Sequence, residues 1–414
     1  MPPDVVAPSY RALFAIRGFP RLVASMLLAR TATEMLGLIF VLFALQRYQS
    51  AAVAGAVVFL DATPGLLMSP LAGALLDRHG RTRLMILDYL VAGVIMATIA
   101  ALALADRLPV PLLLALVAIA SVTGILSRVG VRTLFPLIVP KSLWERANAI
   151  DSNGYVISSV VGPAAAGAVV AAFGPETGLF ITAAVFLVAA GVTIGLRDPG
   201  PSGTQGPLLA EAWAGVRYVA RNRTLRALAI SVSTNAVGWG LFFIALPVLV
   251  IQRIGASAAE VGILFALYGA TGFLSVLFFG RISTAGRERQ LMCGAIVGTT
   301  LSYLLVLLAP HPLVVGFAMA FAGLANGPFD IVLFTIRQRR THPDWLGRAF
   351  AVSMALNFSG FPLGSALAGA IVPLSLELAL VAAIAFTAAA AVLTWALIPA
   401  HEADEAAPRV EAAT

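Results

Sequence analysis

The chain has 414 residues, of which 60% are hydrophobic and only 11% are Asp, Glu, Lys or Arg. Soluble proteins carry about 45–50% apolar and about 25% charged residues, so this composition excludes a water-soluble globule with an ordinary surface. The formal net charge is +7, but the basic residues sit in short loops between apolar runs, so we expect them to set membrane topology and expect no nucleic-acid partner.

Apolar runs of about 20 residues recur along the chain and predict membrane-spanning helices, because in lipid the backbone must satisfy its own hydrogen bonds. We therefore expect an all-α membrane protein with twelve spans. They lie near residues 22–46, 52–76, 84–105, 110–131, 147–172, 177–196, 226–251, 259–280, 290–309, 312–336, 346–373 and 377–398.

The stretch between the sixth and seventh runs breaks the pattern. It opens with the turn-rich residues 197–203 and continues as an amphipathic segment over 208–219. The sequence thus predicts an N-terminal six-helix bundle over 1–196, a linker with a short helix over 197–225, a C-terminal six-helix bundle over 226–400 and a polar, disordered tail over 401–414.

Charge sorting gives the expected orientation. If the N-terminus is cytoplasmic, the inner loops and ends hold 22 of the 27 Lys and Arg residues, and the outer loops hold only Arg47, Arg107 and Arg253. Because basic loops stay on the cytoplasmic side, this asymmetry predicts an even number of spans with both termini in the cytoplasm.

The two halves match each other at an offset of 202 residues. The segment Gly162–Gly167 falls on Gly364–Gly369, and Arg146 falls on Arg348. We interpret spans five and eleven as copies, since repeats of six helices are a common design of transporters. The alternative is that two Gly- and Ala-rich helices match by composition.

A short charged turn lies between the second and third runs, over residues 73–83. Its pattern, G-x-x-x-D-R-x-G-R-x-R, resembles the signature loop of major facilitator superfamily transporters. The resemblance implies two pseudo-symmetric six-helix bundles and a conformational latch whose arginines pair across the two halves in one conformation. The latch residues are Gly73, Asp77, Arg78, Gly80 and Arg81. The alternative is an ordinary positive-inside loop. In the second-half counterpart, Ser283–Arg289, a serine replaces the aspartate.

The segment containing Gly162, Pro163 and Gly167 is similar to the Gly-Pro motif that facilitator-superfamily antiporters carry in span five, although Ser158 and Ala166 depart from it. Residues 326–328, 337–340, 347–350 and 146–149 together resemble the branch that holds bacterial macrolide, siderophore and multidrug exporters, and this resemblance implies a multi-pass protein of the bacterial inner membrane. The alternative for the Gly-Pro segment is close packing of helices through small residues.

Charges within spans are costly, so each is a functional hypothesis. We expect Glu34, Asp61 and Asp330 to exchange protons, and Arg30, Arg128 and Asp151 to form ion pairs. Alternatives are pairing of Arg30 with Glu34, which share a helix face, and pairing of Arg128 with Asp77, Asp151 or Glu145. Candidates for the substrate cavity, or for ordinary packing, are Trp239, Phe243, Asn326 and Asn357.

The sequence predicts secondary active export of amphipathic small molecules by alternating access, driven by inward proton flow. Uptake by symport or uniport is the alternative within transport. No G-x-S-x-G, H-E-x-x-H or phosphate-binding loop occurs, so we expect no enzyme activity. The single Cys293 and the scattered histidines predict neither disulfides nor a metal site. We expect no cofactor, and a monomer whose partners are the substrate, protons and the lipid bilayer.

Overall fold

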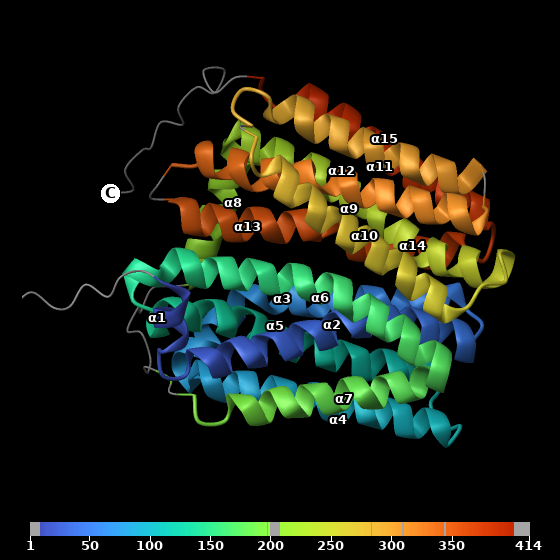
Figure 1. The fold of residues 1–414 in the computed structure, drawn as a ribbon, viewed down its shortest axis with the longest axis horizontal. Coiled ribbons are helices and arrows are strands. Elements are labelled where there is room, and N and C mark those ends of the chain that lie inside the picture. The colour runs from blue at the N-terminus through green and yellow to red at the C-terminus, as the bar shows by residue number, and fades with distance from the viewer. Residues whose placement is uncertain are drawn as a thin grey trace, which may run out of the picture. The chain divides into compact units, whose positions relative to one another are not determined.

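The computed structural model describes residues 9–196, 198, 208–282, 284–308, 310–342 and 345–400; some side chains in α3, α5, η1, α6, α8 and α13 also lie outside the description. Regular structure in these ranges is helical, as Figure 1 shows. The helices are α1 Tyr10–Phe14, α2 Phe19–Arg47, α3 Ala51–His79, α4 Arg81–Leu104, α5 Val110–Ile138, η1 Lys141–Leu143, α6 Trp144–Phe173, α7 Pro175–Thr193, α8 Leu208–Arg221, α9 Arg223–Val248, η2 Leu249–Arg253, α10 Ala258–Phe279, α11 Glu288–Leu308, α12 Pro312–Arg339, α13 Leu346–Phe358, α14 Gly360–Ile371 and α15 Leu376–Leu397.

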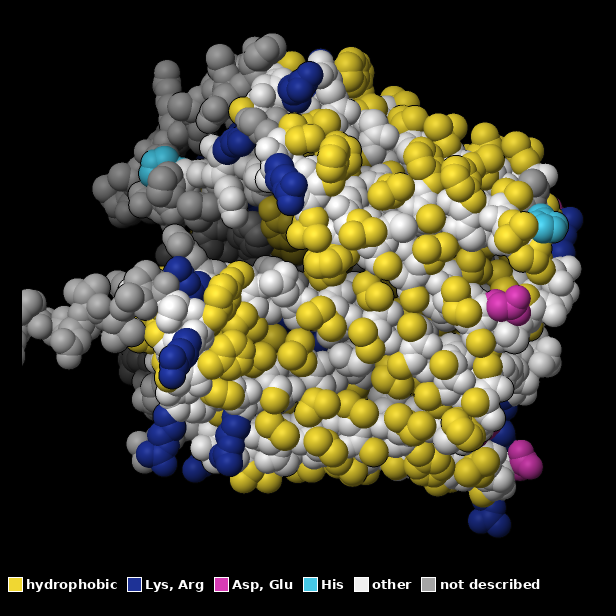
Figure 2. All heavy atoms as spheres, in the orientation of Figure 1, with side chains coloured by type: hydrophobic (Ala, Val, Ile, Leu, Met, Phe, Trp, Pro, Cys, Tyr) yellow, Lys and Arg dark blue, Asp and Glu magenta, His cyan; other side chains and the backbone are white. Residues whose placement is uncertain are grey.

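Twelve helical stretches within the described residues are long and apolar enough to cross a membrane, which confirms the expected number of spans. Hydrophobic side chains are spread over the whole visible flank of each half, whereas Lys and Arg side chains lie mainly at the ends of the helices (Figure 2). An apolar flank is what lipid requires, since a charge at the bilayer centre costs about 2.5–3.5 kcal/mol on insertion scales.

The eleventh span is interrupted, whereas we expected a continuous run over 346–373. It consists of α13 and α14, which meet at Ser359. The N–H of Ser359 donates to the carbonyls of Ala355 and Leu356, and Pro362 offers no N–H to the carbonyl of Phe358. A proline weakens a helix one turn before its own position, which accounts for the break.

Packing divides the chain into two compact units. The first contains residues 1–46 and 60–205, and the second contains residues 47–59 and 206–414. The start of α3 belongs to the second unit because Gly55 lies against the backbone of α14, where its missing Cβ lets it approach Gly369. The linker helix of the sequence analysis is α8, which packs on α9 and α13 of the second unit.

The offset of 202 residues also relates contacts within the two units. In the first unit a Cβ on Gly162 of α6 would lie 3.0 Å from the backbone nitrogen of Met35 on α2. In the second unit Gly364 of α14 packs on the backbone of Val237 on α9. Both partners are displaced by the same 202 residues, so the repeat preserves a helix–helix contact as well as a sequence pattern.

A second pair of contacts follows the same rule. The hydroxyls of Ser158 and Thr31 lie 3.2 Å apart in the first unit, and Gly360 packs on the backbone of Ser233 in the second. All four residues again correspond at an offset of 202. Spans one and five, and spans seven and eleven, therefore form equivalent pairs, which composition alone would not produce.

Candidate functional site: charged and aromatic side chains within the spans

The helices α2 and α6 approach each other closely at Glu34. A Cβ added to Gly162 would stand 2.5 Å from the Cβ of Glu34, so only glycine fits at this crossing. Gly167, one turn and a half further along α6, is also buried, and Pro163 interrupts the hydrogen bonding of this helix. The predicted proton site and the predicted Gly-Pro segment are thus in direct contact.

Arg30 pairs with Asp151 rather than with Glu34. Its Nη2 lies 2.6 Å from Oδ1 of Asp151, and Nη1 donates to the Asp151 carbonyl at 2.7 Å. The guanidinium also lies over the ring of Tyr155, 5.1 Å from its centroid. Glu34 lies one helical turn from Arg30 on the same face and could compete for its guanidinium. The two hydrogen bonds to Asp151 of α6 hold the guanidinium instead.

Arg128, on α5, acts electrostatically on three carboxyls of the first unit: Glu34, Asp61 and the buried Asp88. Among side chains that the structure describes, no carboxylate oxygen lies within ion-pair distance of its guanidinium. Asp151, one expected partner, is engaged by Arg30, and the side chains of Asp77 and Glu145 lie outside the description. The exposed Arg128 therefore balances several carboxyls at longer range.

Asp61 lies where α3 carries Pro64. The hydroxyl of Ser121 on α5 donates to the Asp61 carbonyl at 2.6 Å and accepts from the Gly65 N–H at 3.0 Å. These two backbone groups are four residues apart, so they are the pair that an uninterrupted helix would join. Ser121 thus supports α3 at this point with a side-chain hydroxyl, which its apolar sequence neighbours did not reveal.

In the second unit, Trp239 and Phe243 belong to an aromatic cluster. Trp239 stacks on Tyr268 of α10 with ring centroids 5.1 Å apart, and Phe243 contacts Phe265 at 5.2 Å and Phe361 at 5.4 Å. Trp239 and Phe243 are both half-buried. Sequence patterns identified Trp239, Phe243 and Phe361 but missed Tyr268, which belongs to another span.

Asp330 lies on α12 beside the same cluster. The amide nitrogen of Asn326 donates to its Oδ2 at 2.7 Å, and its charge acts on the hydroxyl of Tyr268. Asp330 corresponds to Arg128 at the offset of 202 residues, and α5 and α12 begin at the same offset. The repeat therefore places opposite charges at equivalent positions of its two copies.

Asn357 is 4% exposed, and Arg337 is fully buried beside it. In the amide orientation that satisfies both groups, the Asn357 oxygen accepts from Nη2 of Arg337 at 2.5 Å and its nitrogen donates to the Ser353 carbonyl at 3.1 Å. Nη1 of Arg337 contacts Sδ of Met354 at 2.9 Å. The Asn357 amide is thus engaged by the protein itself in this conformation.

The turn between α3 and α4 contains part of the predicted latch. Gly80 has φ +89°, a backbone conformation that favours glycine. Arg78 is exposed, whereas Arg81 is 4% exposed and its Nη1 lies 3.8 Å from Oδ1 of Asp198. Oδ2 of Asp198 accepts from the Thr82 N–H at 3.3 Å, so this carboxylate favours the N-terminal end of α4.

Gly73 and Asp77 of the predicted latch fall within α3, and beyond that helix assignment they lie outside the described residues. Asp198 was missed by sequence reasoning. In the sequence, only the position of Asp198 in the turn-rich start of the linker, directly after the sixth span, pointed to a role at this end of the unit.

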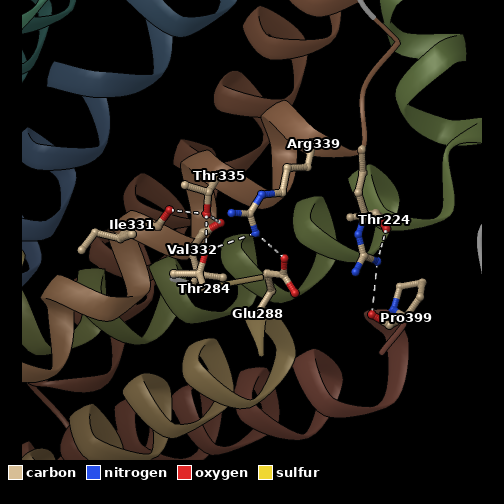
Figure 3. Close-up of polar contacts among 9 residues, drawn as sticks. Thr224, Thr284, Glu288, Ile331, Val332, Thr335, Arg339 and Pro399 are labelled. Atoms are coloured by element: carbon tan, nitrogen blue, oxygen red, sulfur yellow. Dashed lines mark hydrogen bonds and ion pairs between the residues drawn. The ribbon is translucent and has the colours of Figure 1, made fainter. Parts of the chain in front are cut away.

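At the corresponding end of the second unit, Arg339, the last residue of α12, and Arg340, which follows it, hold several segments together (Figure 3). Arg339 donates to Glu288 at 2.7 Å and to the hydroxyl of Thr284 at 3.3 Å. Arg340 donates to the hydroxyl of Thr224 and to the carbonyl of Pro399, both at 3.2 Å. The second-half turn thus supplies Thr284 and Glu288 to Arg339, while its Ser283 lies outside the description.

No group of three His, Cys, Asp or Glu side chains that could hold a metal ion occurs in the described part of the chain. The described side chains within the spans offer carboxyls, arginines, amides and aromatic rings. Such groups can bind an amphipathic molecule and exchange protons.

Comparison with known proteins identifies the family. A major facilitator superfamily model described as "Transmembrane secretion effector" matches residues 40–413. The chain is 37% identical to the uncharacterized MFS-type transporter y4rN of Sinorhizobium fredii, over 94% of this chain and 97% of that protein. It is 25% identical to the multidrug efflux pump Tap of Mycolicibacterium fortuitum, over 78% of this chain and 82% of the pump. It is 26% identical to the enterobactin exporter EntS of Shigella boydii, over 72% of this chain and 71% of the exporter.

Solved structures agree on the fold. The nucleoside transporter NupG superposes with a TM-score of 0.74 at 13% identity, covering 92% of this chain and 99% of that structure. An inward-facing bacterial homolog of the human lysosomal transporter Spinster superposes with a TM-score of 0.74 at 14% identity, covering 97% of this chain and all of that structure. The resemblance inferred from the charged turn is confirmed: this chain is a twelve-span membrane transporter that belongs to the major facilitator superfamily.

Proposed function

We propose that this transporter exports amphipathic small molecules by alternating access and that inward proton flow drives the export. Two relatives whose names state a direction, the multidrug efflux pump Tap and the enterobactin exporter EntS, support export. The Gly-Pro segment of α6 points the same way. We further propose a monomer in the bacterial inner membrane with both termini in the cytoplasm.

The contact between Glu34 and Gly162 carries the proposal for proton coupling. Because α6 touches the Glu34 Cβ directly, a change in this side chain acts at the crossing of α2 and α6. Arg30 is held by Asp151, so the exposed Arg128 is the cation whose attraction changes most when Glu34 gains or loses a proton. Protonation removes that attraction, which gives the two protonation states different preferences for the facing states of the transporter.

In the second unit, Asp330 and the aromatic cluster supply the proposed substrate contacts. Trp239 and Phe243 offer ring faces, and Asn326 holds the Asp330 carboxylate through one hydrogen bond. A half-buried carboxyl that has an amide partner, and no ion pair with the side chains described, is suited to exchange a proton or to meet a positively charged group. Asn357 joins this set only if Arg337 releases its amide.

The charged turn is proposed as the latch of the transport cycle. In this conformation Arg81 is engaged by Asp198 within the first unit, while Arg78 is exposed. We propose that these arginines, with Gly73, Asp77 and Gly80, exchange partners when the facing state changes. Exchange between two defined sets of ion pairs would give the two states comparable stability.

The test is transport in proteoliposomes with an imposed pH gradient and ethidium as the amphipathic probe. We expect the wild-type protein to move ethidium against its gradient only when protons flow in the opposite direction. Glu34→Gln, Asp61→Asn and Asp330→Asn, tested singly, should identify the coupling carboxyl as the variant that binds ethidium but no longer responds to the pH gradient. Asp106→Asn, in an exposed turn outside the spans, is the matched control.

Undiminished coupling in all three variants would reject these proton sites. Uptake is the second candidate function, and cells lacking the gene distinguish it: deletion of an exporter raises the amount of ethidium inside, whereas deletion of an importer lowers it.

A further inference from the structure

The linker helix α8 is fixed on the second unit with a defined rotation. Val219 is 2% exposed and packs in a core cluster with Leu225 and Leu228 of α9. The ring of Tyr218 stacks on Trp345 with centroids 4.9 Å apart and planes 8° apart, and its hydroxyl accepts from the His342 N–H at 3.0 Å. Because these contacts use one side of α8, the opposite side is presented outward.

The position of α8 places it at the boundary of a membrane span. It ends at Arg221, and α9, the seventh span, begins two residues later at Arg223. Asn222 joins the two helices: its side chain accepts from the Leu225 N–H at 2.8 Å and donates to the Arg340 carbonyl at 3.1 Å. We therefore expect the last turns of α8 to lie at the depth where the bilayer meets water, near Arg340, which directly follows α12.

The outward side of α8 changes from apolar to basic around the helix. Successive residues turn by about 100°, so Val216, Ala220, Trp213, Arg217 and Arg221 follow one another around one exposed arc. Trp213 is 63% exposed and Val216 is 38% exposed. An exposed tryptophan between an apolar edge and a basic edge is typical of a helix that lies in the membrane interface.

We propose that the outward face of α8 binds the headgroups of anionic phospholipids. Trp213 and Val216 lie against the boundary of the acyl chains, and Arg217 and Arg221 contact the phosphates from the basic edge. Arg223 and Arg226 are exposed at the start of α9 and extend the positive charge. Long arginine side chains can keep their stems on apolar surface while the guanidinium reaches the headgroup.

A lipid surface fits this face better than a free anion or a nucleic acid. Either of those would use the arginines and leave the tryptophan and the valine in water. A lipid satisfies both edges at once. Because α8 is fixed on α9 and α13, a lipid bound to α8 is held against the second unit.

The experiment measures quenching of Trp213 fluorescence in nanodiscs that hold the full-length protein. Brominated phosphatidylglycerol is compared with brominated phosphatidylcholine at equal mole fractions, and the signal of the Trp213→Phe variant is subtracted. We expect the anionic lipid to quench more strongly. Arg217→Gln or Arg221→Gln should each lower this selectivity about five-fold, the change that corresponds to about 1 kcal/mol per arginine near an anionic surface.

Arg107→Gln, which removes the same charge from an exposed loop outside α8, is the control and should leave the selectivity unchanged. Raised salt should reduce the selectivity of the wild-type protein because it screens exposed charges. Equal quenching by both lipids would overturn the proposal, as would the absence of quenching by either lipid, which would place Trp213 in water or against a protein partner.

Discussion

Replacement of Gly162 by alanine tests whether the crossing of α2 and α6 requires the absence of a side chain. The new Cβ would stand 2.5 Å from the Glu34 Cβ, 3.0 Å from the Met35 nitrogen and 3.1 Å from the Glu34 carbonyl carbon. Carbon atoms in contact prefer separations of about 3.5–4.0 Å, so the helices must separate by about 1 Å. Two of the three neighbours are backbone atoms, which cannot turn aside.

Overpacking of this kind costs about 1–3 kcal/mol, and alanine returns up to about 1 kcal/mol through its higher helix propensity. Because two of the three close neighbours are backbone atoms, the cost lies in the upper part of this range, about 2–3 kcal/mol, and we expect a net loss of about 1–2 kcal/mol. For a folding unit of this size, each kcal/mol corresponds to about 2–4 °C in Tm, so Tm should fall by about 2–8 °C. The assay is thermal unfolding of the purified protein in detergent, followed by intrinsic fluorescence and by the fraction that remains monodisperse.

Gly37→Ala is the matched control, because Gly37 lies on the same α2 helix and a Cβ added there would have nothing within 4 Å. We expect this variant to be as stable as the wild type or slightly more stable. Gly364→Ala, the repeat equivalent on α14, should behave like Gly162→Ala. The reasoning is refuted if Gly162→Ala unfolds at the wild-type temperature, or if Gly37→Ala loses as much stability.

Three further outcomes are expected. Arg30→Gln and Asp151→Asn should each lower the free energy of unfolding by about 2–3 kcal/mol, since each leaves a partly buried charge without its partner. In a thermal double-mutant cycle the double variant should lose less than the sum of the two single losses. Strictly additive losses would show that the pair is not coupled. Ser121→Ala should lower the free energy of unfolding by about 1–3 kcal/mol because two backbone groups of α3 lose their hydroxyl partner. Thr98→Ala is the control: the Thr98 hydroxyl bonds within its own helix, and its loss should change stability by less than about 0.5 kcal/mol. Equal unfolding temperatures for the two variants would contradict the supporting role of Ser121. Asn222→Ala should lower the free energy of unfolding by about 1 kcal/mol through loss of the α9 helix cap. It should also make the junction of α8 and α9 more sensitive to protease. Unaltered cleavage kinetics would argue against the role of Asn222 in joining the two helices.

The sequence determined the class of the protein and most of its helical layout. Twelve runs of about 20 apolar residues were sufficient because a run of that length can satisfy its backbone in lipid only as a helix. The turn at residue 80 indicated the family through its pattern of glycine and charges, and the φ of +89° at Gly80 gives the local reason for that glycine. The break at Ser359 was not predicted, although Pro362 and Gly360 carried its local signal, because membrane helices also tolerate proline without a break, as α6 and α12 do at Pro163 and Pro328.

The partners of individual charges were decided by the tertiary structure. The spacing along α2 suggested that Arg30 pairs with Glu34. The guanidinium instead binds Asp151 of α6, which is 121 residues distant and accepts through both its carboxylate and its carbonyl. The contact of Ser121 with the backbone of α3 depends on a close approach that no periodicity describes. Hydrophobic pattern is a property of one helix, whereas pairing depends on which faces of different helices meet, and that is fixed only when small residues such as Gly162 bring the backbones together.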